Sequence, residues 1–287
     1  MADRDTFSVI PAIDVHGHYG TFLQDDGNAL VNEFMSADAA AVAARAAACG
    51  VHWSIVSPLM GLLPRGRPDS VRANEEAFRE IRSVPGLLQY AIVNPKQPET
   101  FEQARRMLKS PHCVGIKIHP EEHDYRISEE GSRLFEFFAE IDAPVMTHSG
   151  CPNSLPIDFV PFADEFPSVR LLLAHLGNGA GDHGRPDLQV EAIEAAKYGN
   201  VWVDTSSGRS LTPNLIEWAV SRIGSGRLLF GSDTPLYHVA MQKARIEAAD
   251  IPFEDKVTIL RTNAIEFFSL HRIHGVADAW PAARARP

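Results

Sequence analysis

Two histidines lie two positions apart near the N-terminus, in the segment Asp14-Val15-His16-Gly17-His18. Side chains at positions i and i+2 of a β-strand point to the same side, so both imidazoles can reach one metal ion. Loop histidines that make structural hydrogen bonds can show the same spacing, so the pair alone leaves both interpretations open. Whether the pair binds a metal or makes structural hydrogen bonds therefore depends on which other polar residues are expected close to it.

Four more potential metal ligands each follow a short apolar run: His119, His148, His175 and Asp233. The carboxyl ends of the strands of a parallel barrel open at one rim, so we expect these side chains to meet His16 and His18 there. Several imidazoles and one carboxylate form a typical donor set for a divalent first-row ion, Zn most readily. Burying them without an ion would leave several polar groups unpaired, which costs free energy. The sequence therefore predicts a metal site.

The elements that must position these residues alternate along the chain. Apolar or β-branched runs predict eight strands, at residues 9–15, 53–57, 88–93, 114–118, 144–147, 170–174, 201–204 and 228–231. Helical stretches are predicted between them, at residues 36–49, 69–82, 98–108, 128–140, 187–198 and 212–222. Eight βα units in series predict an α/β fold, a single-domain (β/α)8 TIM barrel. The alternative is an open doubly wound sheet, but the phosphate-binding patterns GxGxxG and GxxxxGK[ST] that favour it do not occur.

The barrel domain is expected to occupy residues 1–274. Residues 275–287 are mainly Ala, Arg and Pro and are expected to form a flexible C-terminal tail. Irregular loops are expected at residues 19–35 and 58–68, after the first two strands. Ser36 is expected to cap the first helix and Gly50 to end it.

The composition of the chain argues against several classes of binding partner. The 287 residues include 27 Lys and Arg against 37 Asp and Glu, which gives a net charge of −10 at pH 7 and argues against nucleic acid. No run of about 18 apolar residues and no signal-peptide pattern occur, so we expect neither a membrane span nor secretion. The three cysteines, Cys49, Cys113 and Cys151, give no disulfide framework and suit a reducing cytoplasm. The expected partners are a small-molecule substrate and, as one possibility, a second copy in a homodimer.

The segments DVHGH, GIKIHP, THSG, LAHLG and FGSDTP occur in this order, and together they resemble the amidohydrolase superfamily. The resemblance covers residues 1–270 and is to the amidohydrolase-related branch, often called "amidohydrolase 2". That branch includes aminocarboxymuconate-semialdehyde decarboxylase and its relatives. The resemblance implies a metal-dependent barrel enzyme.

The resemblance also implies roles for individual residues. His16, His18 and His148 match metal ligands, and Asp233 matches the carboxylate that binds the metal and accepts a proton from its water. His175 matches a residue that is a ligand in two-metal members and lies beside the bound water or substrate in one-metal members. Lys117 matches the position of a carboxylated lysine that bridges two ions. One ion is favoured and two are possible.

Lys117 has three interpretations. A free ammonium is a poor neighbour for a metal cation, so this lysine is carboxylated, or it binds a substrate carboxylate, or it pairs with an acid such as Glu121. His119 points the same way and could contact a second ion or the substrate. Weaker candidates for binding the substrate are Tyr19, Arg65 and Arg67.

The predicted reaction is hydrolysis of an amide, lactone or other ester of a small polar substrate, which could carry a carboxylate. Metal-activated water would attack the carbonyl, and Asp233 and His175 would be catalytic. The first alternative is non-oxidative decarboxylation of an aromatic or unsaturated acid. Some such decarboxylases of the branch replace the first histidine of HxH with Glu, so His16 favours hydrolysis. The second alternative is a barrel that binds a metal or ligand without turnover.

Overall fold

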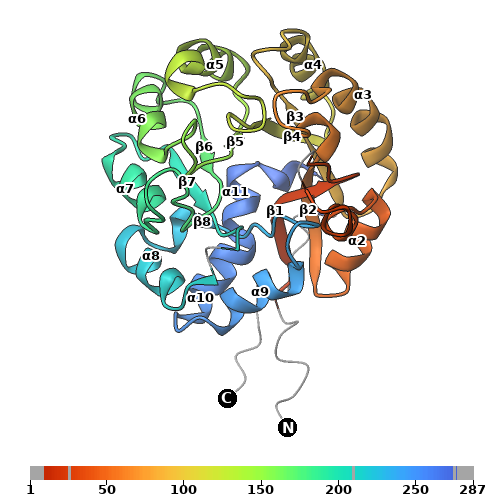
Figure 1. The fold of residues 1–287 in the computed structure, drawn as a ribbon. Coiled ribbons are helices and arrows are strands. Elements are labelled where there is room, and N and C mark those ends of the chain that lie inside the picture. The colour runs from red at the N-terminus through yellow and green to blue at the C-terminus, as the bar shows by residue number, and fades with distance from the viewer. Residues whose placement is uncertain (1–9, 25–26, 209–210, 274–275, 277–287) are drawn as a thin grey trace.

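A computed structural model describes residues 10–24, 27–208, 211–273 and 276 of the chain. Its centre is one parallel sheet of eight strands in sequence order (Figure 1). The strands are β1 (Ala12–Tyr19), β2 (Val51–Pro58), β3 (Leu87–Ile92), β4 (Cys113–Ile118), β5 (Val145–Thr147), β6 (Leu171–Leu173), β7 (Val201–Asp204) and β8 (Leu228–Leu229). The predicted α/β fold, a single-domain TIM-type barrel, is confirmed.

Backbone hydrogen bonds between β1 and the segment that follows β8 close the ring. The Val15 N–H donates to the Phe230 carbonyl at 2.9 Å, and the Asp233 N–H donates to the His16 carbonyl at 2.7 Å. The closure therefore places the residues after β8 directly beside the end of β1.

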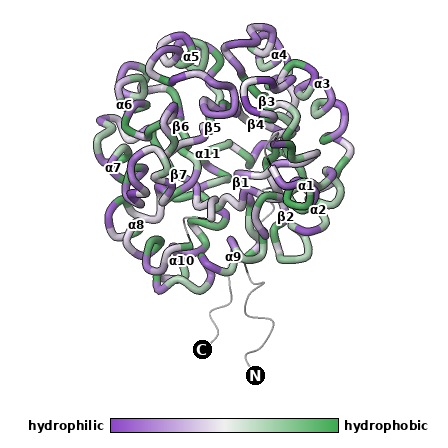
Figure 2. Tube along the Cα trace, in the orientation of Figure 1, coloured by the Kyte–Doolittle hydropathy of each residue, from purple (hydrophilic) through white to green (hydrophobic). Residues whose placement is uncertain are grey.

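Helices cover the outside and one end of the ring of strands (Figure 1). They are α1 (Ala29–Phe34), α2 (Ala39–Ala47), α3 (Ser70–Glu80), α4 (Glu99–Met107), α5 (Ile127–Ile141), α6 (Pro156–Glu165), α7 (Leu188–Ala195), α8 (Leu215–Ile223), α9 (Val239–Ala248), α10 (Phe253–Val257) and α11 (Asn263–Phe267). The outer helices carry both hydrophilic and hydrophobic residues (Figure 2), and their apolar sides pack on the strands. Among the described residues, no helix has the length and apolar character that crossing a membrane requires.

Apolar side chains fill the barrel interior at one end, and α11 covers that end. This helix lies at the centre of the ring in Figure 1. Phe268, just after α11, packs on Tyr90 of β3 with ring centroids 5.8 Å apart. The Tyr90 hydroxyl donates to the Val15 carbonyl at 2.7 Å, so this buried polar group is paired. One end of the barrel is thus sealed, and its polar residues collect at the other.

A β-bulge lies in β1 just before the paired histidines. Asp14 pairs with Ser54 of β2 and Gly17 pairs with Val56, so β1 uses one residue more than β2 over this interval. Ile13 and Val15 belong to the apolar cluster inside the barrel, and without the extra residue the side chains of His16 and His18 would point outward. The bulge is therefore what turns both imidazoles into the barrel mouth.

Some predicted boundaries were wrong. The loop expected at residues 19–35 contains α1, and α6 and α9 were not predicted. Asp38 caps α2 by accepting from the Ala41 N–H at 2.7 Å, whereas Ser36 Oγ accepts from the Phe22 N–H instead. Within the predicted tail, Val276 is buried, and its carbonyl accepts a hydrogen bond from Arg261. The rest of that tail, 275 and 277–287, lies outside the described residues.

Replacing Gly115 with Ala should destabilise the barrel. A Cβ at Gly115 would lie 2.9 Å from the Pro144 carbonyl oxygen and 3.1 Å from the Tyr90 ring, inside a packed interior. Overpacking of this kind costs about 1–3 kcal/mol, to be measured by denaturant unfolding. Gly226→Ala is the control, because a Cβ there meets nothing within 4 Å. Equal unfolding midpoints for Gly115→Ala and wild type would show that the interior is not tightly packed.

Candidate metal centre

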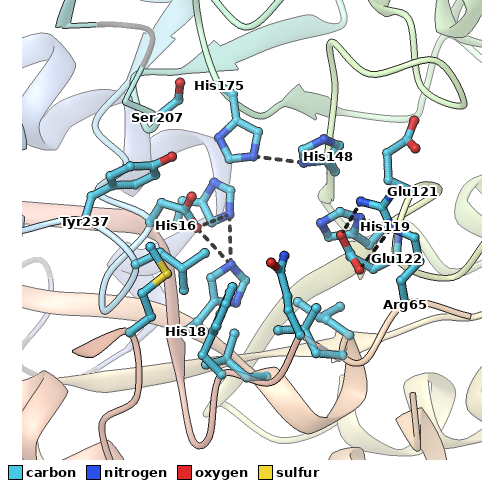
Figure 3. Close-up of a pocket in the computed structure, with 18 of the residues that line it drawn as sticks. His16, His18, Arg65, His119, Glu121, Glu122, His148, His175, Ser207 and Tyr237 are labelled. Atoms are coloured by element: carbon cyan, nitrogen blue, oxygen red, sulfur yellow. Dashed lines mark hydrogen bonds and ion pairs between the residues drawn. The ribbon is translucent and has the colours of Figure 1, made fainter. Parts of the chain in front are cut away.

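The ends of β1 and β8 bring three potential ligands together. The Nε2 atoms of His16 and His18 are 3.2 Å apart, and Asp233 Oδ1 lies 3.6 Å and 3.2 Å from them, respectively. All three side chains are buried, and His16 and His18 point into the same space in Figure 3. Gly17 allows this approach, because a Cβ there would lie 3.0 Å from Val56 Cγ1.

Hydrogen bonds at the Nδ1 atoms of His16 and His18 orient the two imidazole rings. His16 Nδ1 lies 2.7 Å from Asp204 Oδ2, and His18 Nδ1 lies 3.3 Å from the Ser57 carbonyl oxygen. The Asp204 carboxylate only accepts, so it requires a proton on His16 Nδ1 and leaves a lone pair on His16 Nε2. When His18 Nδ1 donates to the Ser57 carbonyl, its Nε2 carries a lone pair as well. Oxygen partners behind ligating histidines play this orienting role in metal sites.

This donor set fits a divalent ion. Two lone pairs and a carboxylate oxygen face one another at 3.2–3.6 Å with no proton of their own to share. Ligands at about 2.1 Å from an ion in tetrahedral geometry are themselves about 3.4 Å apart, which matches these separations. His16, His18 and Asp233 would therefore hold the ion.

Two of these side chains have pKa values suited to ligation. Burial, reinforced by the charge of Lys117, lowers the pKa of His16 to about 3, so its imidazole is neutral at pH 7. Burial alone would raise the pKa of Asp233, but the neighbouring His16 and His18 outweigh it and hold that pKa at about 2. His16 and Asp233 are thus both deprotonated at neutral pH, as metal binding requires.

Lys117 of β4 lies under the cluster. Its Nζ is 2.9 Å from His16 Nε2, and the side chain is almost wholly buried. Burial lowers its pKa to about 8. The suggested pairing with Glu121 is not formed, because Glu121 accepts from the Asn153 N–H. In this structure the ammonium of Lys117 is the cation that faces the His16 lone pair.

A chain of hydrogen bonds extends from the cluster through His175. Its Nδ1 lies 2.9 Å from Ser206 Oγ. Its Nε2 lies 3.0 Å from His148 Nδ1 (Figure 3). Ser206 Oγ also donates to Asp204 Oδ1 at 2.5 Å, and His148 Nε2 lies 3.2 Å from Cys151 Sγ. One set of protons satisfies every link, from the Cys151 thiol to the Asp204 carboxylate. The chain can therefore pass a proton in steps.

His175 and Asp233 share an uncommon backbone conformation. Their φ angles are +72° and +59°, in the left-handed region that non-glycine residues seldom adopt. The His175 N–H donates to Asp204 Oδ1 at 3.0 Å and the Asp233 N–H donates to the His16 carbonyl, so partners in the site hold both backbones. Such conformations cluster at functional sites.

The metal cluster opens into a cavity of about 390 Å³. One wall is apolar and is formed by Phe22, Leu59, Leu62, Leu63 and Leu236. His119, Glu121, Glu122 and Arg65 lie together on one polar side, and Tyr237 lies across the cavity from them (Figure 3). The cavity can therefore enclose a small molecule that has one apolar and one polar side.

Some of the remaining predicted site residues line the metal cavity, and others lie outside it. His148 lies outside the ligand cluster, hydrogen-bonded to His175 and stacked on His119 with ring centroids 4.3 Å apart. Arg65 lines the cavity, but its guanidinium is paired with Glu122 at 2.8 Å. Tyr19 and Arg67 do not line this cavity; they line a separate groove. For these residues the predicted roles stay predictions.

Sequence reasoning missed Asp204, Ser206 and Ser57. Asp204 ends β7, so the rule that selected the other strand-end residues would have found it. Ser206 follows two residues later and Ser57 lies near the end of β2, but serines are too common at such positions to stand out.

An acceptor cluster at the carboxyl ends of barrel strands is characteristic of metal-dependent barrel enzymes. Comparison with known families agrees with this class. The family model described as Amidohydrolase matches residues 13–270, so the chain belongs to the amidohydrolase family, as the sequence motifs indicated.

Curated relatives are decarboxylases. A gamma-resorcylate decarboxylase of Rhodococcus jostii (strain RHA1) is 31% identical over 121 residues, which cover 38% of this chain and 36% of the relative. One from Rhizobium sp. (strain MTP-10005) is 30% identical over 119 residues, which cover 37% and 36%. The matched part thus spans about a third of the length of these relatives.

Solved structures share the fold over nearly the whole chain. A 2,6-dihydroxybenzoate decarboxylase from Rhizobium superposes with a TM-score of 0.71 at 17% identity and covers 91% of this chain and 98% of its own. A 5-carboxyvanillate decarboxylase from Sphingomonas paucimobilis gives 0.67 at 15% identity and covers 91% and 99%. A dihydroxybenzoic acid decarboxylase from Polaromonas sp. JS666, with bound manganese and the inhibitor 2-nitroresorcinol, gives 0.68 at 17% identity and covers 92% and 98%.

The prediction of hydrolysis is wrong. The relatives that match by sequence and the solved structures named above are decarboxylases, and none of these is a hydrolase. His16 at the first position of HxH was a poor discriminator, because hydrolases and decarboxylases of this kind use nearly the same ligands. The expectation of zinc also rested on donor types alone, whereas the Polaromonas structure holds manganese.

Protein purified without chelator should contain about one divalent ion per chain, measured by elemental analysis. His18→Ala and Asp233→Asn should each lose it, because each removes one of three ligands. Lys117→Ala should keep about one ion. Two ions in wild type, falling towards one in Lys117→Ala, would instead indicate a centre bridged by a carboxylated lysine. No bound ion after incubation with Mn²⁺ or Zn²⁺ would contradict the metal site.

Asp204→Asn should weaken metal binding about 10–100-fold in a chelator competition, because it removes the charge that orients His16. The exposed Asp250→Asn is the matched control and should bind the ion as wild type does. Unchanged affinity in Asp204→Asn, with the fold verified by circular dichroism, would show that His16 needs no carboxylate behind it.

Proposed function

We propose that this protein is a metal-dependent, non-oxidative decarboxylase of a small aromatic acid. The observation that carries the proposal is a cluster of two imidazoles and a carboxylate, within 3.6 Å of one another, that opens into a cavity with one apolar wall. The decarboxylase relatives support the same reaction and substrate class. Either Mn²⁺ or Zn²⁺ suits the donor set.

The cavity suits an aromatic acid in size and in polarity. Its volume of about 390 Å³ lies within the range of about 300–1,000 Å³ that is usual for small-molecule sites. The leucines and Phe22 can bury one face of a ring, while His119 and Arg65 can receive its polar substituents. Arg65 would keep its contact with Glu122 and offer its remaining N–H groups.

The reaction breaks one carbon–carbon bond and places one proton. The carboxylate leaves as CO₂, its bonding electron pair stays with the ring carbon, and that carbon takes up a proton. A bound divalent ion would supply positive charge that orients the carboxylate and an adjacent hydroxyl oxygen. The burial of His16, His18 and Asp233 keeps bulk water from competing for those positions.

Asp233 and His175 are the two groups beside the cluster that can carry the proton. Asp233 lies within 3.2 Å of His18 and can accept a proton from a substrate hydroxyl before passing it on. His175 is tied to Ser206 and His148, so it can be reloaded with a proton along that chain. His148 stays a proposed additional ligand, which would require its ring to leave His175.

The metal-loaded protein should release CO₂ from a hydroxylated aromatic acid such as 2,6-dihydroxybenzoate. In D₂O the product should carry one deuterium at the carbon that lost the carboxylate, measured by NMR. Asp233→Asn should lower kcat by at least about 100-fold, because a positioned proton carrier contributes about 10²–10⁴ in rate. His175→Gln should lower it as well.

The exposed Glu129→Gln is the control and should turn over as wild type does. Absence of CO₂ release from a panel of hydroxybenzoates, with metal content verified, would overturn the proposal. Ligand binding without consumption that Asp233→Asn leaves unchanged would point to a non-catalytic barrel.

A further inference from the structure

A second groove, with a volume of about 470 Å³, lies beside the ends of β1 and β2 and against α3. It is separate from the metal cavity, although Leu63 lines both. Tyr19 lies at its base. Tyr19 follows His18 directly, so its side chain points to the opposite side of β1, away from the barrel mouth.

The hydroxyl of Tyr19 has no partner among the described residues. Tyr19 is 6% exposed and belongs to an apolar cluster that includes Val42, Val56 and Ala77. Because Tyr19 lines the groove, its hydroxyl is available to hydrogen-bond to a molecule bound there. The hydroxyl is not sealed from solvent, so a polar group of a ligand in the groove can hydrogen-bond to it.

Negative charge surrounds this hydroxyl. Four carboxylates line the groove against a single guanidinium: Asp38, Asp69, Glu76 and Glu80 against Arg67. Glu76 is paired with Arg72 at 2.7 Å, whereas the carboxylate of Glu80 has no partner within the described part of the chain. Burial and the charges of Asp38 and Glu76 raise the pKa of Glu80, as expected for an uncompensated carboxylate.

The arrangement suits an organic cation better than a metal ion. Within the described ranges, the tight groups of three metal-ligating side chains all include His16, at the barrel mouth. Among the described residues, no three carboxylates of the groove therefore lie close enough together to share one ion. Met60 and Leu63 also line the groove, and their apolar side chains can contact the carbon skeleton of a ligand.

We propose that this groove binds a small organic cation, an amine or guanidine on a short alkyl chain. Its charged group donates hydrogen bonds to the Tyr19 hydroxyl and the Glu80 carboxylate, and its chain lies along Met60 and Leu63. The site is distinct from the metal centre and does not depend on the reaction proposed for it.

Calorimetric titration with n-hexylamine at low salt tests this site. Tyr19→Phe and Glu80→Gln should each weaken binding about tenfold, because the first removes a hydrogen-bond acceptor for the ammonium group and the second removes the negative charge beside it. Hexanoate and hexanol should not bind measurably. The exposed Glu129→Gln, outside the groove, should bind as wild type does, and so should Asp233→Asn at the metal centre.

Equal hexylamine affinity in wild type, Tyr19→Phe and Glu80→Gln would overturn the proposal, since it would show general attraction to an acidic surface. Binding lost only in Asp233→Asn would overturn it as well, because the amine would then occupy the metal cavity. Thermal unfolding of Tyr19→Phe near the wild-type temperature shows that lost binding is not lost folding.

Discussion

Two imidazole lone pairs and one carboxylate oxygen face one another across 3.2–3.6 Å in the barrel mouth. Groups of this kind repel one another and are stable together only with positive charge close by. In the structure that charge is the ammonium of Lys117. The bulge in β1 and the closure between β1 and β8 both serve to hold these acceptors in place. The partner behind His16, Asp204, also reaches Ser206 and the backbone of His175, so one carboxylate orders most of the site.

The fold was predictable because buried parallel strands are continuous apolar runs, and such runs are visible without a structure. The run at residues 201–204, for example, coincides with β7. The helix α6 was harder to predict, because Pro161 inside it is a residue that normally ends helices. The convergence of His16, His18 and Asp233 followed from one rule, that the carboxyl ends of barrel strands meet at one rim.

The direction of individual side chains was less predictable. In β4, Gln89 pairs with Cys113 and Tyr90 with Gly115, so this strand also contains an extra residue. Val114 points into the barrel, and without that residue Lys117 would point out of it. Local sequence does not reveal a bulge of this kind. Tyr19 shows the opposite case, because strand alternation after His18 already predicts that it faces away from the metal centre. The type of reaction was least predictable, since the ligands are nearly common to two chemistries.

The bulge in β1 also limits which insertions and deletions the sequence can tolerate. Loss or gain of one codon between Ile13 and His16 would remove the extra residue or add another, and either would reverse the facing of both histidines. Many substitutions in this segment would leave that facing intact, because it depends on residue number rather than residue type. Among descendants of this chain, the spacing between Ile13 and His16 should therefore stay fixed even where an apolar residue such as Val15 is exchanged for another.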